Sequence, residues 1–346
     1  MKAAVLTGIR KIEIADVAEP RITCDKDVLL RIDTVGVCGS DVHYYETGRI
    51  GSQVVQYPFI VGHECAGTVL AVGKAVSRVK PGDRVFIEPA VTCGTCDQCR
   101  RGRANTCRNL RFLGCPQQIG GCLCEYLVMP EHCCFAIEPS LPFDRAVLCE
   151  PLAIGLYAVR TAAVGPGDNV AILGAGPIGL SCLLSARAVG VQGCFMTEKI
   201  DDRITTAADA GASWVGNPTT ENVVGEILDR CGGVEAVFEC AGQQDTVDQA
   251  VELLMPGGKL MMIGIPRTER VSVVIDKARR KEISIINVRR QNNCTRDCID
   301  LVTSGRISVD FMITHRFGLD KTQEAFEMVA GYLHGIVKAL IEVQRT

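Results

Sequence analysis

Hydrophobic and polar positions alternate in short runs along the first third of the chain. These runs are bounded by Gly and Pro, and they include KAAVLTG, KIEIADV, DVLLRIDTVGV, GTVLAVG and EYLVMP. Apolar and β-branched runs between turn residues predict β-strands rather than helices. Residues 1–148 are therefore expected to form a mainly-β domain.

The spacing becomes helical near residue 144 and then alternates between two patterns. FDRAVLCEPLAIGLYAVRTAAV has helical spacing, with an interruption expected near Pro151. From residue 169 strand-like runs such as NVAIL, GCFMTE, VEAVFECAG and KLMMIGIP alternate with helical ones. A βαβα series predicts a parallel sheet with helices on both faces. Residues 149–290 are thus expected to form a Rossmann-type, doubly wound α/β domain, with KLMMIGIP near the edge of its sheet and available to pair across a two-fold axis.

A mixed pattern returns after residue 290 and ends in the strand-like run VKALIEV. A strand at this position could pair with the N-terminal β region. We therefore predict a discontinuous β domain made of residues 1–148 and 291–346, with the α/β domain inserted between the two parts.

Composition and charge narrow the possible partners. The 346 residues are 47% hydrophobic, and 37 Lys and Arg nearly balance 40 Asp and Glu. Such a balance gives no electrostatic reason to expect binding to nucleic acid or to an anionic membrane surface. The opening run is too short and too polar for a signal peptide, and no apolar stretch is long enough to span a membrane. We expect a cytoplasmic protein in which most of the 19 cysteines are buried, reduced thiols.

The run NVAILGAGPIGL contains a glycine-rich turn between a strand-like and a helical segment. Gly174 permits a tight turn, Gly176 lets the backbone approach a pyrophosphate, and Gly179 allows close helix packing. The helix that starts at Pro177 and Ile178 would direct its free N–H groups at the phosphates. This segment is predicted to bind a dinucleotide.

The next strand-like run ends in Glu198. An acid at this position can accept hydrogen bonds from the ribose hydroxyls and repels a 2′-phosphate, which favours NAD over NADP. Lys199 and Arg203 lie close in sequence and weaken this exclusion. We also count Arg203 among the expected cofactor-binding residues.

The run CGTCDQCRRGRANTC predicts a metal site within a lobe at about residues 90–110. Four thiolates complete a tetrahedral zinc site and leave no position for a substrate, so the predicted role is structural. Nearby arginines would offset its negative charge. An iron–sulfur cluster is an alternative for cysteines at short spacing, but the context does not resemble a ferredoxin. The four predicted ligands are Cys93, Cys96, Cys99 and Cys107.

A second metal site is predicted from VGVCGSD and VGHECAG. Catalytic zinc takes three protein ligands and keeps one position open. Cys38 and His63 are candidate ligands beside Gly-containing turns, and the carboxylate would come from Glu64 or Glu150. Each residue alone would more simply be a buried thiol or a hydrogen-bonded histidine, but the glycine turn and the four-cysteine lobe favour the catalytic interpretation.

Over essentially its full length, the chain resembles the zinc-dependent medium-chain alcohol dehydrogenase superfamily. The resemblance rests on GHE at 62–64, the four-cysteine lobe, GAGPIG and the order of domains. CGSDVHYYETGRIG, IEPA, EPLAIG and THRF resemble the polyol branch, which contains sorbitol and xylitol dehydrogenases. The resemblance implies a GroES-like catalytic domain joined to a Rossmann domain, one catalytic and one structural Zn²⁺ per chain, and a homotetramer.

The resemblance also implies roles for individual residues. Cys38, His63 and Glu64 would bind the catalytic zinc, with Glu150 separated from it by a water. Asp41 would orient His63. Ser40 and His43 would relay protons together with Glu150, and Tyr44, Glu150 and Arg290 would contact the polyol. The segment around Arg290 reads RRQNN and departs from the aromatic–Arg–Tyr run common in this branch, which affects the expected substrate length and stereochemistry.

The implied reaction is oxidation of a secondary hydroxyl to a ketose with hydride transfer to NAD⁺. The alternatives are a 2,3-butanediol dehydrogenase or a threonine dehydrogenase of the same superfamily. A non-enzymatic protein that binds zinc or nucleotide is a more remote alternative. It would be expected to lack a ligand or relay residue, whereas all of these residues are present.

Overall fold

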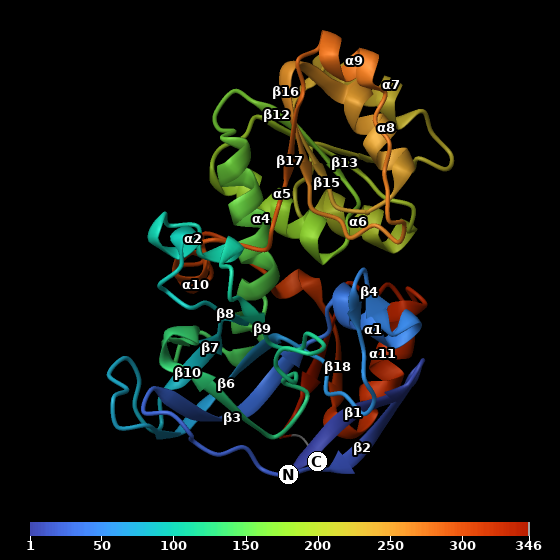
Figure 1. Ribbon diagram of the computed structural model, residues 1–346. Coiled ribbons are helices and arrows are strands. Elements are labelled where there is room, and N and C mark those ends of the chain that lie inside the picture. The colour runs from blue at the N-terminus through green and yellow to red at the C-terminus, as the bar shows by residue number, and fades with distance from the viewer. Residues whose placement is uncertain (345–346) are drawn as a thin grey trace. The chain divides into compact units, whose positions relative to one another are not determined.

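The computed structural model describes residues 1–344 and divides into two compact units (Figure 1). Unit 1 contains residues 1–150 and the segment from residue 295 onward, and unit 2 contains Pro151–Cys294. The sequence predicts boundaries after residues 148 and 290, whereas the units divide after residues 150 and 294. The first boundary falls within one helix, which a pattern of helical spacing cannot locate.

Unit 1 is built mainly from strands. Its N-terminal part contains β1 (Lys2–Gly8), β2 (Lys11–Asp16), β3 (Asp27–Gly36), α1 (Gly39–Thr47), β4 (Arg49–Ile50), β5 (Gln53–Val54), β6 (Glu64–Val72), β7 (Arg84–Ile87), β8 (Ala90–Val91), α2 (Asp97–Arg100), β9 (Arg111–Phe112), β10 (Tyr126–Pro130), β11 (Cys134–Ala136) and α3 (Phe143–Ala146). Its C-terminal part adds α10 (Thr295–Thr303), β18 (Ile313–Gly318), α11 (Thr322–Ala330) and β19 (Lys338–Glu342).

The central feature of unit 1 is a seven-stranded sheet with the order β11-β7-β6-β3-β19-β18, in which β10 also pairs with β3. Alternate residues of β3 are buried, as expected for a strand with one face on a core. The strand predicted from VKALIEV is β19, and it pairs antiparallel with β3 so that Leu340 lies opposite Gly36. The return of the chain therefore places a late strand beside the N-terminal ones.

Unit 2 alternates helices and strands. Its elements are α4 (Cys149–Ala162), β12 (Asn169–Leu173), α5 (Pro177–Ala188), β13 (Gly193–Thr197), α6 (Asp201–Asp209), β14 (Trp214–Gly216), α7 (Val223–Cys231), β15 (Val234–Glu239), α8 (Gln244–Leu253), β16 (Leu254–Met262), α9 (Ile275–Arg280) and β17 (Ser284–Asn287). The parallel sheet has the order β14-β13-β12-β15-β16-β17, with α4 and α5 on one face and α7 and α8 on the other (Figure 1). This is the strand order of the Rossmann fold, so the predicted α/β class is confirmed.

One local prediction in unit 2 is wrong. The KLMM part of KLMMIGIP forms the end of β16, which pairs with β15 on one side and β17 on the other, so the edge strand on this side of the sheet is β17. The sequence SIIN, which forms β17, was not predicted as a strand because charged residues precede and follow it. The interruption expected near Pro151 is confirmed, since α3 ends at Ala146 and α4 begins at Cys149. Pro151 lies in the first turn of α4, where its missing N–H would have no helical partner.

Within residues 1–344, no helix is long and apolar enough to cross a membrane. No disulfide forms in this part of the chain, which holds all 19 cysteines. Most of these thiols are buried, as the sequence predicts.

Candidate active site

The start of α1 places Cys38 and Asp41 beside each other. Cys38 is the N-cap residue with extended backbone, and Oδ2 of Asp41 accepts a hydrogen bond of 3.2 Å from its N–H. This is a capping-box arrangement with Asp in place of Glu at the third helical position. The cap fixes both side chains at one end of α1.

Three predicted metal ligands meet at one point of unit 1. One ligand atom from each of Cys38, His63 and Glu64 lies within 4.8 Å of the others, and His63 and Glu64 are buried. Nδ1 of His63 lies 3.3 Å from Oδ1 of Asp41, which also accepts a hydrogen bond from Gly62 N–H. A histidine held at Nδ1 by a carboxylate presents Nε2 to a metal.

The electrostatic environment of His63 suits a cation. Burial alone would lower its pKa, but the Asp41 carboxylate and the Cys38 sulfur raise the pKa well above its ordinary value. The surroundings therefore favour positive charge on or beside this imidazole, and a divalent metal ion would supply it.

Glu64 has a second partner in Lys338 on β19. The ammonium of Lys338 donates to both carboxylate oxygens, at 2.8 and 2.7 Å, and the two residues are each 1% exposed. Burial opposes the charged form of Lys338, but Glu64, Cys38 and Glu150 outweigh this effect and raise its pKa. The pair is therefore a buried ion pair.

Glu150 adds a free carboxylate oxygen to this region. It is buried, its Oε2 has no hydrogen-bond partner, and burial raises its pKa to about 8, with the charges of Glu64 and Glu88 adding to the effect. Glu88 is itself held by Thr295, whose hydroxyl donates to Oε2 at 2.6 Å. An unpartnered buried oxygen of this kind is suited to a hydrogen bond from a bound water or hydroxyl.

The other residues predicted near this site, Ser40, Tyr44 and His43, all belong to α1 but make different contacts. Ser40 donates from its hydroxyl to the Cys38 sulfur at 3.4 Å, and Tyr44 donates to Gln53 at 3.1 Å from a buried position. The carbonyl of His43 accepts a hydrogen bond from Thr47, which holds its backbone within α1. Ser40 thus touches a predicted ligand, and His43 belongs to the same helix.

The four cysteines of the lobe are also brought together. Neighbouring sulfur atoms lie 3.5 to 3.9 Å apart between Cys107 and Cys93, Cys96 and Cys99, and Cys96 and Cys107. A zinc tetrahedron with bonds of about 2.3 Å has sulfur–sulfur edges of about 3.8 Å, so the set fits this metal. Hydrogen bonds from the N–H groups of Thr95 and Cys96 lower the pKa of Cys93 to about 5, which favours its thiolate. Arg108, one of the arginines expected to offset the thiolate charge, pairs with Asp97, and the backbone N–H groups of Cys99 and Arg108 lower the pKa of Cys96.

In unit 2 the glycine turn joins β12 to α5. Gly174 has a left-handed φ of 103°, and a Cβ on Gly179 would overlap the Gly174 carbonyl oxygen. Gly176 caps α5 and Pro177 begins it, so the free N–H groups of the first turn point out of the helix end. This cradle fits a pyrophosphate at the carboxyl edge of the sheet.

Glu198 and Arg203 both lie against this turn. One oxygen of Glu198 accepts a hydrogen bond of 2.8 Å from Ala175 N–H, and the other accepts from the N–H groups of Lys199 and Ile200. Nη1 of Arg203 would lie 3.6 Å from a Cβ on Gly176. The sequence did not indicate that Glu198 also holds the turn itself.

Comparisons with known proteins agree with both units. Residues 24–139 match the family model "Alcohol dehydrogenase GroES-like domain" and residues 177–304 match "Zinc-binding dehydrogenase". A sorbitol dehydrogenase of Bacillus subtilis is 35% identical over 347 residues, covering 100% of this chain and 98% of the relative. The chain belongs to the zinc-dependent medium-chain alcohol dehydrogenases.

Solved structures of similar proteins support the same fold for this dehydrogenase. An Escherichia coli oxidoreductase of unknown specificity superposes with a TM-score of 0.94 at 34% identity, with 99% of each chain covered. A zinc-binding dehydrogenase from Sinorhizobium meliloti, bound to NADP, has a TM-score of 0.90 at 32% identity, again with 99% of each chain covered. The predicted combination of a GroES-like and a Rossmann domain is confirmed.

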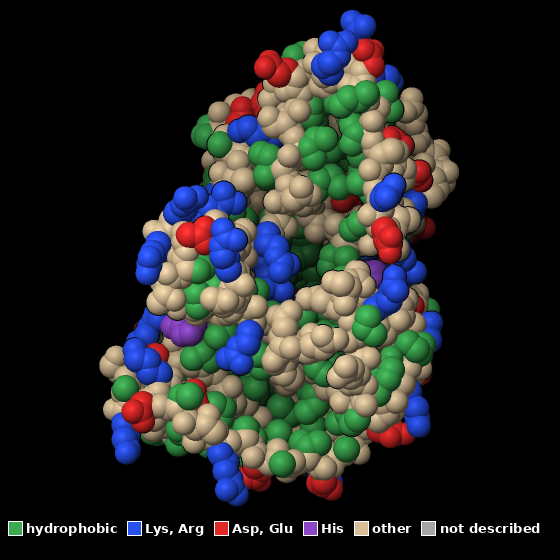
Figure 2. Space-filling model, viewed as in Figure 1, with side chains coloured by type: hydrophobic (Ala, Val, Ile, Leu, Met, Phe, Trp, Pro, Cys, Tyr) green, Lys and Arg blue, Asp and Glu red, His purple; other side chains and the backbone are tan. Residues whose placement is uncertain are grey.

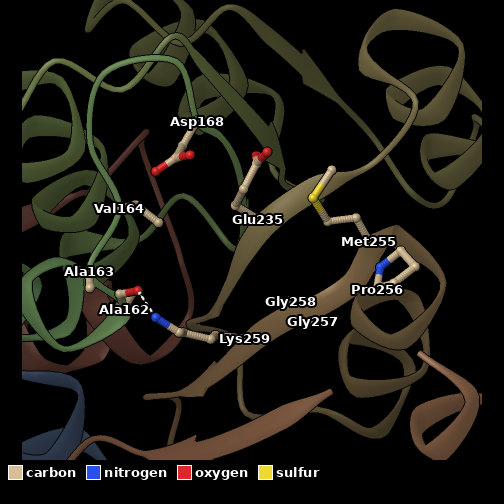
Figure 3. A pocket seen from close by; sticks show the side chains of 10 residues that line it. All are labelled: Ala162, Ala163, Val164, Asp168, Glu235, Met255, Pro256, Gly257, Gly258 and Lys259. Carbon is tan, nitrogen blue, oxygen red and sulfur yellow. Dashed lines mark hydrogen bonds between the residues drawn. The ribbon is translucent and has the colours of Figure 1, made fainter. Parts of the chain in front are cut away.

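A pocket of about 290 Å³ in unit 2 of the dehydrogenase is a different feature (Figure 3). It is lined by Asp168, just before β12, by Glu235 near the start of β15, and by Lys259 of β16. Lys259 donates to the Ala162 carbonyl across it at 2.6 Å. Because dinucleotides bind at the carboxyl ends of parallel strands, this pocket is at the wrong edge for the cofactor.

The sequence analysis missed Lys338 and Gly36 at the site of this dehydrogenase. A lysine inside the apolar run VKALIEV was the available signal, because a buried ammonium requires an acidic partner. Arg290 lies after β17 in unit 2 with a left-handed φ of 54°, and its predicted contact with substrate stays a prediction.

Proposed function

We propose that this dehydrogenase oxidises a secondary hydroxyl of a polyol, such as sorbitol or xylitol, to a ketose while reducing NAD⁺. The observation that carries the proposal is the convergence of Cys38, His63 and Glu64 near the unpartnered buried oxygen of Glu150. The similarity to a sorbitol dehydrogenase over the whole chain supports a polyol as the substrate class.

The proposed roles follow from the donor set. Cys38, His63 and Glu64 would hold Zn²⁺, which supplies Lewis acidity toward the substrate hydroxyl. Asp41 fixes the His63 tautomer through Nδ1. Glu150 would accept a hydrogen bond from a water or from a neighbouring hydroxyl, and this contact would favour vicinal polyols over simple alcohols.

The reaction releases one hydride and one proton from the substrate. A nicotinamide cofactor held by the glycine turn would accept the hydride, and the remaining product would be a ketone. Ser40, within hydrogen-bond reach of Cys38, would take part in moving the hydroxyl proton toward water, with His43 further along the relay. Tyr44 and Arg290 are the proposed polyol contacts.

Two further groups of residues are proposed to bind the structural zinc and the dinucleotide. Cys93, Cys96, Cys99 and Cys107 would hold a second, structural Zn²⁺ with no open position. The glycine turn from Gly174 to Gly179 would bind the pyrophosphate, with Glu198 favouring NAD. The S. meliloti relative was solved with NADP bound, so the preference of this chain for NAD over NADP is tested by the assay below.

We also propose a homotetramer of two-fold related dimers in a reducing compartment such as the cytoplasm. β17 is one of the two edge strands of the unit 2 sheet, and Ile285 within it is 44% exposed. Figure 2 shows hydrophobic side chains gathered over the part of unit 2 where Figure 1 draws β16 and β17. An exposed apolar edge strand is well suited to pairing with a second copy, and the many reduced cysteines fit a compartment that keeps thiols reduced.

The test is NADH or NADPH formation by zinc-replete protein with a substrate panel. The panel contains xylitol, sorbitol, galactitol, arabitol, inositol, 2,3-butanediol and threonine, each with NAD⁺ and with NADP⁺. Turnover of one or two polyols with NAD⁺ supports the proposal. Activity with butanediol or threonine alone would keep the zinc-dependent hydride transfer and overturn the substrate class.

A further inference from the structure

Lys338 makes three hydrogen bonds at the candidate metal site. Its ammonium donates to Oε1 and Oε2 of Glu64, and it donates a third hydrogen bond of 3.1 Å to the carbonyl of Val37. An ammonium has three N–H donors, so every donor of this buried group is used. Lys338 is therefore fixed, and it holds both oxygens of one predicted metal ligand.

The position of Glu64 is restrained from the opposite side as well. Gly36 lies opposite Glu64 in the β3–β6 pairing, and a Cβ on Gly36 would overlap Oε2 of Glu64. The carboxylate thus lies in space that only glycine leaves open, between β3 and the ammonium from β19. Three neighbouring strands cooperate to hold one side chain.

A carboxylate held this way has two competing uses. Its oxygens can remain on Lys338, or one can turn to a zinc ion held by Cys38 and His63, whose ligand atoms lie within 4.8 Å. The charge of Lys338 also offsets that of Cys38, Glu64 and Glu150. Direct zinc binding by Glu64 must then weaken a buried ion pair, and this weakening is costly.

We propose that Lys338 is a positioning residue that competes with the catalytic zinc for Glu64 and thereby keeps the zinc–Glu64 bond weak and exchangeable. The inference rests on the zinc site of the proposed function. A purely structural ion pair would behave differently, because its loss would disorder Glu64 and weaken zinc binding.

The experiment measures release of catalytic zinc from zinc-loaded protein to an excess of a chromogenic chelator. Five proteins are compared: wild type, Lys338→Met, Lys338→Arg, Glu64→Gln, and Lys338→Met combined with Glu64→Gln. Loaded protein is used so that the result does not depend on folding of a metal-free variant. Cys38→Ser protein, which should hold only the structural zinc, identifies the phase that belongs to the four-cysteine site.

Lys338→Met should release catalytic zinc about tenfold more slowly than wild type, since Glu64 loses its competitor and binds the metal fully. Lys338→Arg should stay close to wild type because it keeps the cation. In the Glu64→Gln background the effect of Lys338→Met should disappear. In cobalt-substituted protein, Lys338→Met should shift the visible absorption bands relative to wild type, reporting a changed ligand set, whereas Lys338→Arg should leave the bands in place.

Two results would overturn the inference. One is faster zinc release from Lys338→Met, which is the behaviour of a structural pair, and the other is a Lys338→Met effect of equal size in the Glu64→Gln background. The proposed function fails separately, if wild-type and Cys38→Ser proteins release the same amount of zinc.

Discussion

The carboxylate of Glu64 occupies the space that a side chain on Gly36 would need. The two residues face each other across the β3–β6 pairing. Gly36→Ala should push the carboxylate off Lys338 and lower the free energy of unfolding by about 2 kcal/mol, as overpacking in a tight core does. Gly39→Ala is the matched control, because nothing lies within 4 Å of its added Cβ. Denaturant unfolding of both zinc-replete variants checks this, and equal stability would contradict it.

Cys38→Ser should remove the catalytic zinc while leaving nucleotide binding nearly intact. Loss of a residue that only hydrogen-bonds to a metal ligand lowers activity by about 10- to 100-fold. Loss of a ligand itself should lower it further, so kcat should fall by at least about hundredfold. Metal analysis, turnover and NADH binding by fluorescence measure the three properties. Cys24→Ser, at an exposed thiol, should leave all of them unchanged. Undiminished turnover by a variant with its zinc content verified would remove Cys38 from the site.

Cys96→Ser should lower the stability of the protein and leave the catalytic zinc site intact. A four-thiolate zinc site folds its loop, so its loss should lower the free energy of unfolding by about 3 kcal/mol or more. Zinc content should fall by one ion per chain, and the catalytic zinc should persist in the protein that stays folded. Cys24→Ser again serves as the control. Normal stability with normal zinc content would show that the lobe needs no metal.

Glu198→Ala should shift cofactor preference toward NADP. The ratio of kcat/KM for NADP⁺ to that for NAD⁺ should rise about tenfold, because the repulsion of a 2′-phosphate is lost. The KM for NAD⁺ should rise too, since Glu198 also accepts the N–H of Ala175 in the glycine turn. Asp229→Ala, at an exposed acid of α7, is the control. An unchanged ratio would place adenosine specificity elsewhere.

Glu131 should stabilise the protein only above mildly acidic pH. N–H groups of Ser77 and Arg78 donate to its Oε2, and these bonds, with Lys26 nearby, lower its pKa below the ordinary 4.5. A lowered pKa means that its contribution is present above about pH 5 and is lost as the pH falls through the folded-state value. Glu131→Gln should therefore cost about 1 kcal/mol at pH 7 and progressively less below pH 4.5.

Unfolding free energies across this pH range, compared with the exposed control Glu13→Gln, test the Glu131 prediction. A loss that is the same at every pH would show that the carboxylate charge plays no part.

The sequence predicted features whose residues are close along the chain. The four cysteines, the glycine turn and the Gly-His-Glu run carry their chemistry in local spacing, and the strands of unit 2 carry theirs in apolar runs. Lys338 and Gly36 could not be found this way, because their partner Glu64 is joined to them only through the pairing of β3, β6 and β19. Local patterns do not contain that pairing.

The edge of the unit 2 sheet was missed for a related reason. β17 is short, and charged residues precede and follow it, so its pattern resembled a loop. The full role of Glu198 was hidden too, because the sequence shows an acid after a strand but not the three N–H groups that turn toward it.

The position of β19 has a consequence for the order of events during synthesis. β3 is made early, but β19, which completes its pairing and delivers Lys338, is made only after the whole of unit 2 has been translated. Unit 2 can fold on the ribosome as soon as it emerges, whereas the sheet of unit 1 must wait with an open edge. On this view a chaperone or a pause in translation would matter most for unit 1, and its metal-binding pocket would be the last part of the nascent chain to mature.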